Sequence, residues 1–341
     1  MKAAVIRSFG APEVLKYEEV ATPRPGRGNL LIRVVASGIN RLEHYLREGS
    51  VTRDLKLPHI LGSDASGVVA EIGAGVSGFT VGERVVPMPG YPLDSADDAA
   101  RPISAAPSYA IGGILRWGTY AEFVEVPAKW VLKDETNLTP EQVATLPMAL
   151  ITAVRAVKTV GAVTDGSSVL IHAGASGTGS MNIQVAKALG ARVATTVDSE
   201  EKAELALALG ADLVVDVNRT DFVAASREWT GGRGLDVVVD NLGGRILQRS
   251  LNSVRVGGTV VAMGFVDGVE VTIHIREFFF THKRLLGTLM GDVADLQWGF
   301  DMVKQGRIRP SLDRALPLKD AADAHRLIAA NQVRGNLVLI T

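Results

Sequence analysis

A glycine-rich turn between an apolar run and a helical pattern is the feature of this chain most clearly able to do chemistry. Residues Val169–Gly179 read Val-Leu-Ile-His-Ala-Gly-Ala-Ser-Gly-Thr-Gly. Glycine lets the backbone turn sharply and approach a pyrophosphate closely, and the free N–H groups at the start of the next helix can bind that anion. A strand, this turn and a helix in that order predict a dinucleotide site. The residues expected to bind the pyrophosphate are Gly174, Ser176, Gly177, Thr178 and Gly179, with Ser176 tolerated where the three-glycine fingerprint has its middle glycine.

An acidic residue follows the turn at the spacing that a dinucleotide site requires. Asp198 lies 19 residues beyond Gly179, after a second β-rich run, and in such folds an acid about 20 residues on binds the adenosine ribose. We expect Ser199 beside it to belong to the same site. The charge of Asp198 disfavours a 2′-phosphate, whereas Lys202 and Arg219 could pair with one. The predicted cofactor is therefore NAD(P)H, with NADH slightly favoured by Asp198.

Composition narrows the classes of protein that this chain can be. Its 341 residues are 47% hydrophobic and 21% charged, which is typical of a globular protein large enough for two domains. The 36 basic and 37 acidic residues leave no surplus for nucleic acid or an anionic membrane, and no apolar run is long enough to span a bilayer. We expect a cytoplasmic protein with a small-molecule substrate. The absence of cysteine excludes disulfides, thiolate nucleophiles and zinc sites built on cysteine.

The pattern of strands and helices changes along the chain. Roughly the first 125 residues contain short strands between Gly, Pro and Asn clusters, with a lobe over Pro89–Trp117 that lacks periodicity. From Ser168 onward, near-continuous apolar strands alternate with helices, which indicates a parallel sheet covered on both faces. The tail after Gly291 ends in a strand, Asn336–Ile340, expected to return to the β-rich part. The fold class is α/β with an inserted nucleotide domain.

These features together resemble the medium-chain dehydrogenase/reductase superfamily over nearly the whole chain. The match includes Leu61–Val69, Val81–Val85, the glycine turn and Gly231–Val238. The resemblance is greatest to zinc-independent quinone oxidoreductases of the ζ-crystallin type and to enoyl reductases. It implies a GroES-like substrate domain over residues 1–126 and 291–341, a Rossmann domain over residues 127–290, and a homodimer.

The same resemblance identifies the positions at which zinc-dependent relatives hold their catalytic metal with Cys, His and Cys. Asn40, Ser63 and Met148 stand at these positions here, and the lobe that carries a structural zinc in relatives has no cysteine. We therefore expect no zinc. Without a Lewis acid to stabilise an alkoxide, alcohol oxidation is disfavoured. Hydride transfer to a quinone or to an α,β-unsaturated carbonyl remains feasible, because the charge delocalises away from the attacked carbon.

The resemblance also assigns roles to single residues. Asn40 is expected to hydrogen-bond the substrate carbonyl, Tyr45 to supply or relay a proton, and Thr152 to lie close to the nicotinamide. His172 is expected to be a packed, hydrogen-bonded residue rather than a base. Residues that follow successive strands at the carboxyl edge of the sheet, together with one near the C-terminus, are expected to contact the cofactor: Asn241, Phe265, Val266, Leu289, Met290 and Asn336.

Two alternatives stay open from the sequence. One is an alcohol dehydrogenase of the same superfamily with an atypical metal site, for which His44, His59, Glu43 and Asp64 lie in suitable segments. The other is a non-catalytic nucleotide-binding protein. Oxidation of NAD(P)H by quinones or enones separates the leading hypothesis from the second alternative, and the metal content separates it from the first.

Overall fold

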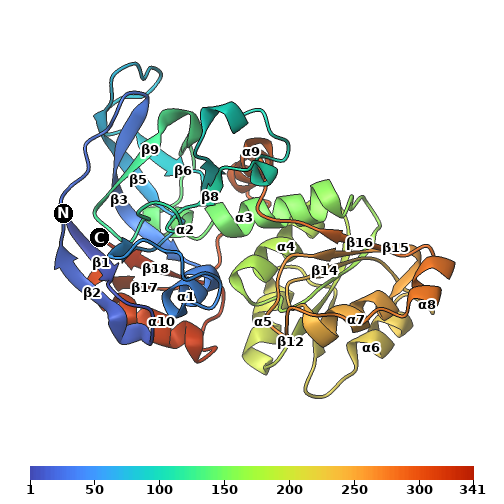
Figure 1. The fold of residues 1–341 in the computed structure, drawn as a ribbon. Helices are drawn as coiled ribbons and strands as arrows, with labels where there is room; N and C mark the ends of the chain where they lie inside the picture. The colour runs from blue at the N-terminus through green and yellow to red at the C-terminus, as the bar shows by residue number, and fades with distance from the viewer. The chain divides into compact units, whose positions relative to one another are not determined.

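The computed structural model describes all 341 residues and divides them into two compact units. Unit 1 comprises Met1–Met148 and Pro310–Thr341, and unit 2 comprises Ala149–Arg309. Figure 1 shows that both termini belong to unit 1, so the chain leaves this unit, builds unit 2 and returns. The inserted arrangement expected from the sequence is therefore present.

Unit 1 is built mainly from antiparallel strands. A seven-stranded sheet has the order β10-β6-β5-β3-β18-β17, with β9 also pairing β3, and smaller sheets have the orders β2-β1-β4 and β7-β8. The strands are β1 Lys2–Ile6, β2 Leu15–Glu19, β3 Asn29–Ile39, β4 His59–Ile60, β5 Ser66–Ile72, β6 Arg84–Pro87, β7 Gly90–Pro92, β8 Tyr109–Ile111, β9 Phe123–Pro127, β10 Val131–Lys133, β17 Leu312–Pro317 and β18 Asn336–Ile340. The helices are α1 Arg41–Glu48, α2 Pro140–Ala144 and α10 Ala321–Ala329, with 3₁₀ turns at Pro12–Val14, Ser95–Asp97, Ile103–Ala105, Ala128–Trp130 and Leu318–Asp320.

The long central strand β3 organises unit 1. It pairs with β5, β9 and β18, all antiparallel, and its residues are almost continuously buried. β3 ends at Ile39, and α1 begins two residues later with Asn40 as its N-cap. The return of β18 to β3 therefore fixes the segment from which α1 projects, and α1 carries both catalytic candidates of this unit.

Unit 2 is a doubly wound parallel sheet with the strand order β13-β12-β11-β14-β15-β16. The chain starts at the central strand β11, moves outward to β12 and β13, and then crosses to β14, β15 and β16. Its strands are β11 Ser168–Ile171, β12 Arg192–Val197, β13 Leu213–Asp216, β14 Leu235–Asp240, β15 Val254–Ala262 and β16 Arg284–Gly287. Its helices are α3 Pro147–Val154 with a π-helical continuation Arg155–Val160, α4 Gly177–Ala188, α5 Glu200–Ala208, α6 Phe222–Trp229, α7 Gly244–Ser253, α8 Ile275–Phe280 and α9 Val293–Lys304.

The core of unit 2 explains why its strands are apolar along their whole length. β11 is buried at every residue because strands lie on both of its sides and helices lie on both faces of the sheet. The reversal of strand order between β11 and β14 places the carboxyl ends of these two strands at a topological switch point, where ligands of such sheets bind.

The boundaries of the two units differ from those expected from the sequence. Residues 127–148 cluster with unit 1, because β10 pairs with β6 and α2 packs against β3. Residues 291–309 cluster with unit 2, because α9 packs on α3, where a Cβ on Gly299 would lie 2.6 Å from Leu150. The Pro89–Trp117 lobe contains β7, β8 and two 3₁₀ turns. No helix of the structure is both long enough and apolar enough to cross a membrane.

Candidate functional site

The glycine-rich turn lies between β11 and α4, as the sequence predicts. Ser176 is the N-cap of α4, and its Oγ accepts a hydrogen bond from the Gly179 N–H at 3.1 Å. A Cβ on Gly174 would lie 2.1 Å from Thr195 Oγ1, and a Cβ on Gly179 would lie 2.1 Å from the Ala173 carbonyl oxygen. Both glycines are therefore required by close packing, while Ser176 stabilises the start of α4.

The other cofactor residues of unit 2 follow the ends of successive strands. Asn241 follows β14, Phe265 and Val266 follow β15, and Leu289 and Met290 follow β16. Phe265, Val266 and Leu289 are 47%, 53% and 52% exposed, so large apolar side chains remain on the surface at this edge. Thr152 of α3 is buried and its hydroxyl contacts the Met290 sulfur at 3.8 Å. Thr152 therefore lies next to Met290, which follows β16 at this edge of the sheet.

Buried polar atoms without partners give an independent test of whether unit 2 fits a dinucleotide. Asn182 Oδ1, Asn241 Oδ1 and Thr288 Oγ1 are buried and have no hydrogen-bond partner. Buried polar atoms are rarely left unsatisfied in folded proteins. Asn241 and Thr288 directly follow β14 and β16, at the edge where ligands of parallel sheets bind. Their free acceptors and the glycine turn fit a polar cofactor such as NAD(P)H.

The ribose-binding end of the site holds an ion pair. Asp198 Oδ1 lies 2.7 Å from Lys202 Nζ, and the Asp198 carboxylate is 44% exposed. Asn218 Nδ2 donates to the Asp198 backbone oxygen at 2.9 Å. Arg219 extends into solvent and pairs with Asp216 at 3.4 Å. Lys202 of α5 therefore partly neutralises the acid, and Arg219 follows β13 near the same end of the sheet.

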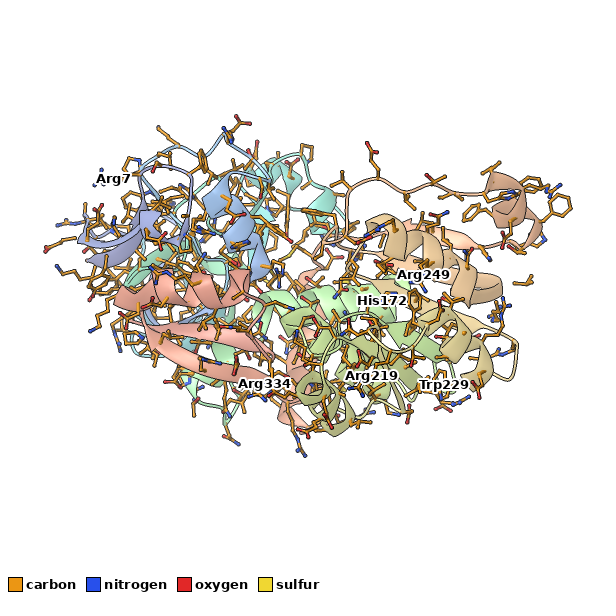
Figure 2. All side chains as sticks on the ribbon, turned by 90° about the horizontal axis from the view of Figure 1, so that it is seen from below. Arg7, His172, Arg219, Trp229, Arg249 and Arg334 are labelled. Atoms are coloured by element: carbon orange, nitrogen blue, oxygen red, sulfur yellow. The ribbon has the colours of Figure 1, made fainter.

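His172 is a buried structural residue, which confirms its assignment from the sequence. Figure 2 shows it inside the nucleotide-binding unit. Its ring nitrogens contact Thr196 Oγ1 at 3.1 Å and Ser250 Oγ at 2.9 Å, while Ser250 donates to Asp240 Oδ2 at 2.7 Å. Burial lowers the pKa of His172 to about 4 against the opposing charge of Asp240. The histidine is therefore neutral at pH 7 and shielded from any substrate.

In unit 1, the three positions that the resemblance assigns to zinc ligands belong to a hydrogen-bonded polar cluster. Asn40 Nδ2 donates to Asp64 Oδ2 at 2.9 Å and to Ser63 Oγ at 3.3 Å. Ser63 Oγ donates to Glu43 Oε1 at 2.6 Å. Asp64 Oδ1 accepts from the Met148 N–H at 2.9 Å. We call Asn40, Glu43, Ser63, Asp64 and Met148 the polar cluster.

The two acids of the polar cluster are almost completely removed from solvent. Glu43 is 0% and Asp64 is 1% exposed. Burial raises the pKa of Glu43 to about 7, although hydrogen bonds from Ser63 and from the Asn40 N–H oppose the shift. Burial also raises the pKa of Asp64 to about 8, and the nearby charge of Glu43 raises it further while the Asn40 amide opposes it. Burial therefore favours the neutral form of Asp64.

The other residues of unit 1 that the sequence suggested as catalytic, cofactor-binding or metal-binding are not members of the polar cluster. Tyr45 lies on α1 and is partly exposed. Asn336 is buried in β18, where its amide donates to the Thr145 carbonyl at 3.4 Å. His44 contacts Arg47, and His59 contacts the Gly113 carbonyl oxygen at 3.0 Å. No group of three or more His, Cys, Asp or Glu side chains is arranged to hold a metal ion.

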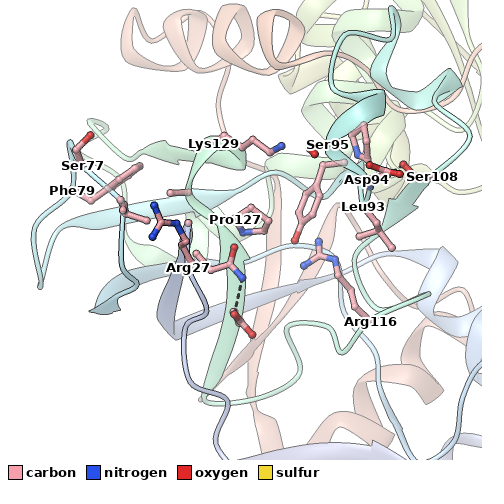
Figure 3. A pocket seen from close by; sticks show the side chains of 18 residues that line it. Arg27, Ser77, Phe79, Leu93, Asp94, Ser95, Ser108, Arg116, Pro127 and Lys129 are labelled. Carbon is pink, nitrogen blue, oxygen red and sulfur yellow. Dashed lines mark hydrogen bonds between the residues drawn. The ribbon is translucent and has the colours of Figure 1, made fainter.

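A separate pocket of about 1210 Å³ opens on unit 1 (Figure 3). The Pro89–Trp117 lobe contributes Arg116 to its wall, and Arg27 and Lys129 bring further positive charge. The Arg116 guanidinium lies 3.9 Å above the Tyr91 ring. None of the catalytic or cofactor residues expected from the sequence lines this pocket.

Comparisons with known proteins identify the family. Residues 26–136 match the alcohol dehydrogenase GroES-like domain, and residues 177–305 match the zinc-binding dehydrogenase domain. The chain is 34% identical to a 2-haloacrylate reductase from Burkholderia sp, with 99% of this chain and 98% of the relative covered. It is 29% identical to the quinone oxidoreductase of Rattus norvegicus, with 100% and 98% covered. A solved NAD-dependent alcohol dehydrogenase is 36% identical with a TM-score of 0.95, and both chains are covered completely.

The chain belongs to the medium-chain dehydrogenase/reductase superfamily, with a GroES-like domain and a Rossmann domain. Within it, the chain is of the zinc-independent type related to quinone oxidoreductases and enoyl reductases. The fold class and the family expected from the sequence are both confirmed.

The sequence did not reveal that Glu43 and Asp64 are buried and hydrogen-bonded to Asn40 and Ser63, and it suggested them only as atypical metal ligands. A signal was present, because Glu43 stands three residues after Asn40 at the start of a helix. Its Oε2 accepts from the Asn40 backbone N–H at 2.8 Å, as in one half of a capping box. Asp64 directly follows Ser63, one of the three positions that the resemblance assigns to zinc ligands.

Proposed function

We propose that this protein is a zinc-independent NAD(P)H-dependent reductase of quinones or of double bonds conjugated to a carbonyl. Unit 2 binds the dinucleotide through the glycine turn, the strand ends and the residues around Asp198. The bound dinucleotide supplies the hydride. The observation that carries the proposal is the polar cluster, in which hydrogen bonds join Asn40, Ser63 and Met148 to buried acids. The resemblance assigns these three positions to zinc ligands.

The chemistry that this cluster supports is hydrogen bonding to a carbonyl oxygen as negative charge builds on it. The Asn40 side-chain amide hydrogen-bonds the substrate oxygen, which stabilises an enolate or a hydroquinone anion. Tyr45 delivers the proton to the reduced product or orients a water that does so. Thr152, Asn241, Phe265, Val266, Leu289 and Met290 hold the nicotinamide end of the cofactor, and Asn336 contributes from β18. A reduced dinucleotide pool is available in the cytoplasm, where we propose that the enzyme works.

A substrate panel tests this function. Oxidation of NADH and NADPH is followed with a 2-substituted acrylate, a cyclic enone and a benzoquinone, and reduction of NAD(P)⁺ is followed with primary and secondary alcohols. The proposal expects turnover with the first group and little with the alcohols. Preferred turnover of alcohols identifies the chain instead as an alcohol dehydrogenase, and binding of cofactor without turnover of either group identifies a non-catalytic nucleotide-binding protein.

The cofactor preference depends on Asp198. We propose that its carboxylate binds the ribose hydroxyls of NADH and that kcat/KM is higher with NADH than with NADPH. Asp198→Ser should move the preference toward NADPH by about 1–3 kcal/mol, because it removes a charge clash and frees Lys202 from the pair at 2.7 Å. Steady-state kinetics with both cofactors measures the shift, and an unchanged ratio shows that Asp198 faces away from the ribose.

We expect the purified protein to contain no stoichiometric zinc and to keep its activity after treatment with a chelator. The reason is the donor set, since an amide, a hydroxyl and a thioether at positions 40, 63 and 148 are poor replacements for two thiolates and an imidazole. Elemental analysis of protein expressed with added zinc provides the measurement. About one zinc per chain, lost together with activity, contradicts this expectation.

We propose a homodimer formed through unit 2. The alternation of apolar and polar residues over Val269–Ile275 predicts an exposed edge that pairs with a second copy, but these residues form no strand; β16 is one of the two edge strands of the sheet. Ile275 and Phe280 near it are 68% and 69% exposed. An open strand beside exposed apolar side chains favours association with a second copy.

Light scattering should give twice the 36.1 kDa chain mass at micromolar concentration. Leu286→Lys places a charge in β16 and should shift the protein toward the monomer without unfolding it, because Leu286 is already 37% exposed. A monomer mass for the unmodified protein contradicts the assignment.

A further inference from the structure

The Asn40 side-chain amide can present either its accepting oxygen or its donating N–H₂ group to a ligand, depending on its rotation. In the structure its nitrogen is bound by the polar cluster, 2.9 Å from Asp64 Oδ2 and 3.3 Å from Ser63 Oγ. The Nδ2 group has two hydrogens, and both are directed into the protein. In this orientation the amide cannot donate to a substrate carbonyl without giving up one of these bonds.

Rotation of the amide by 180° exchanges its two ends with almost no change in shape, because the oxygen and the nitrogen occupy equivalent positions. The rotated amide presents its oxygen to Asp64, which binds this oxygen only if the acid carries a proton. The longer contact with Ser63 is lost, and the Ser63 hydroxyl remains hydrogen-bonded to Glu43 at 2.6 Å. The other carboxyl oxygen of Asp64 stays bound to the Met148 N–H at 2.9 Å in both orientations.

We propose that Asp64 is a positioning residue that selects the orientation of the Asn40 amide. As a neutral acid it donates to the Asn40 oxygen, so that the amide N–H₂ is turned toward the substrate carbonyl; as a carboxylate it holds the N–H₂ group for itself. This inference rests on the proposed role of Asn40 in carbonyl reduction. It predicts that the reductase is active with Asp64 protonated and loses activity as Asp64 ionises.

The surroundings of Asp64 favour the neutral acid at neutral pH. Glu43 of α1 faces it as a second acid, Tyr120 brings a buried phenol near both acids, and Arg47 of α1 is the nearby cation, acting on Tyr120. β3 contributes the uncharged Ser37 and Gly38, whereas α3 contributes the Met148 N–H.

The expected pH dependence follows from these groups. Burial and the charge of Glu43 raise the pKa of Asp64 to about 8. The protonated, active form therefore predominates below that pH and is lost above it. With saturating cofactor and an enone, kcat/KM of the wild-type enzyme should fall about 30-fold between pH 7 and pH 9.5 for a single group titrating near that value.

Two substitutions that keep the size of the side chain show which of the two acids causes the pH dependence. Asp64→Asn keeps an oxygen for the Met148 N–H and places an N–H₂ that always donates to the Asn40 oxygen, so the alkaline fall should disappear. Glu43→Gln removes the charge that raises the pKa of Asp64, so the fall should remain and move to lower pH. If Asp64→Asn does not fold, Asn40→Ala is used instead. Because this variant has no amide for Asp64 to orient, its residual kcat/KM should not fall at alkaline pH.

The outcomes distinguish failure of the positioning role of Asp64 from failure of the proposed reductase function. No alkaline fall in the wild-type enzyme, or a fall that persists in Asp64→Asn, overturns the positioning role while leaving enone reduction intact. If the alkaline decrease of kcat/KM disappears in Glu43→Gln but persists in Asp64→Asn, the titrating group is Glu43, and the positioning role of Asp64 is also overturned. Failure of the wild-type enzyme to reduce any enone or quinone at any pH refutes the proposed function itself.

Discussion

Asn40→Ala should lower kcat for an enone about 100-fold and leave the Kd of NAD(P)H almost unchanged. Loss of one preorganised donor to a developing oxyanion has an effect of this size. Asn40 lies in unit 1, whereas the glycine turn and Asp198 lie in unit 2. The substitution therefore leaves the residues expected to bind the dinucleotide unchanged. Stopped-flow oxidation of NAD(P)H gives kcat, and quenching of protein fluorescence gives the Kd.

A matched variant separates the carbonyl contact from proton delivery. Tyr45→Phe removes a hydroxyl from the same helix and keeps the ring. It should slow enone reduction, where a carbon must be protonated, more than quinone reduction, whose product takes protons readily from water. If Asn40→Ala reduces kcat less than threefold on both substrates, the carbonyl contact is assigned wrongly. Equal small losses for Tyr45→Phe leave solvent as the proton donor.

Gly179→Ala should weaken binding of both NADH and NADPH by at least about 100-fold. The added Cβ would lie 2.1 Å from the Ala173 carbonyl oxygen and 2.8 Å from Ser176 Oγ. Since one neighbour is backbone, the turn must open, which removes the Ser176 cap and displaces the N–H groups that bind the pyrophosphate. Overpacking of this kind also destabilises the fold by about 1–3 kcal/mol.

The control for this variant is Gly287→Ala in β16, where an added Cβ meets no heavy atom within 4 Å. Its cofactor affinity should stay within about threefold of the wild-type value, because the substitution creates no clash. Isothermal titration of both variants with each cofactor gives the comparison, and thermal unfolding checks that they are folded. Tight cofactor binding by a folded Gly179→Ala protein contradicts the placement of the pyrophosphate on this turn.

Much of the fold was predictable because each unit has a strong local pattern. The alternation of short apolar strands with helices from Ser168 onward was predictable, since buried parallel strands are short apolar runs between helices. The glycine turn was predictable for the same reason, as its chemistry lies in consecutive residues. The limits of the two units were less predictable, because the packing of α9 on α3 depends on contacts far apart in sequence.

The polar cluster was not predictable from local pattern. Its members come from α1, from the segment before β5 and from the start of α3, so only the fold brings them together. The sequence identified three positions by comparison with zinc enzymes, but it did not reveal that Glu43 and Asp64 are buried with their hydrogen bonds directed at those positions. Raised pKa values of this kind depend on burial, which is a property of the tertiary structure.

For an enone, the central claim is that hydride reaches the carbon β to the carbonyl. The most direct test uses NADH carrying deuterium at both hydrogen positions of nicotinamide C4 and a cyclic enone, with the product analysed by mass spectrometry and NMR. The account predicts one deuterium per product molecule at the β-carbon and a solvent proton at the α-carbon. Deuterium at the carbonyl carbon of an allylic alcohol shows reduction of the carbonyl itself, as an alcohol dehydrogenase performs it, and contradicts the account.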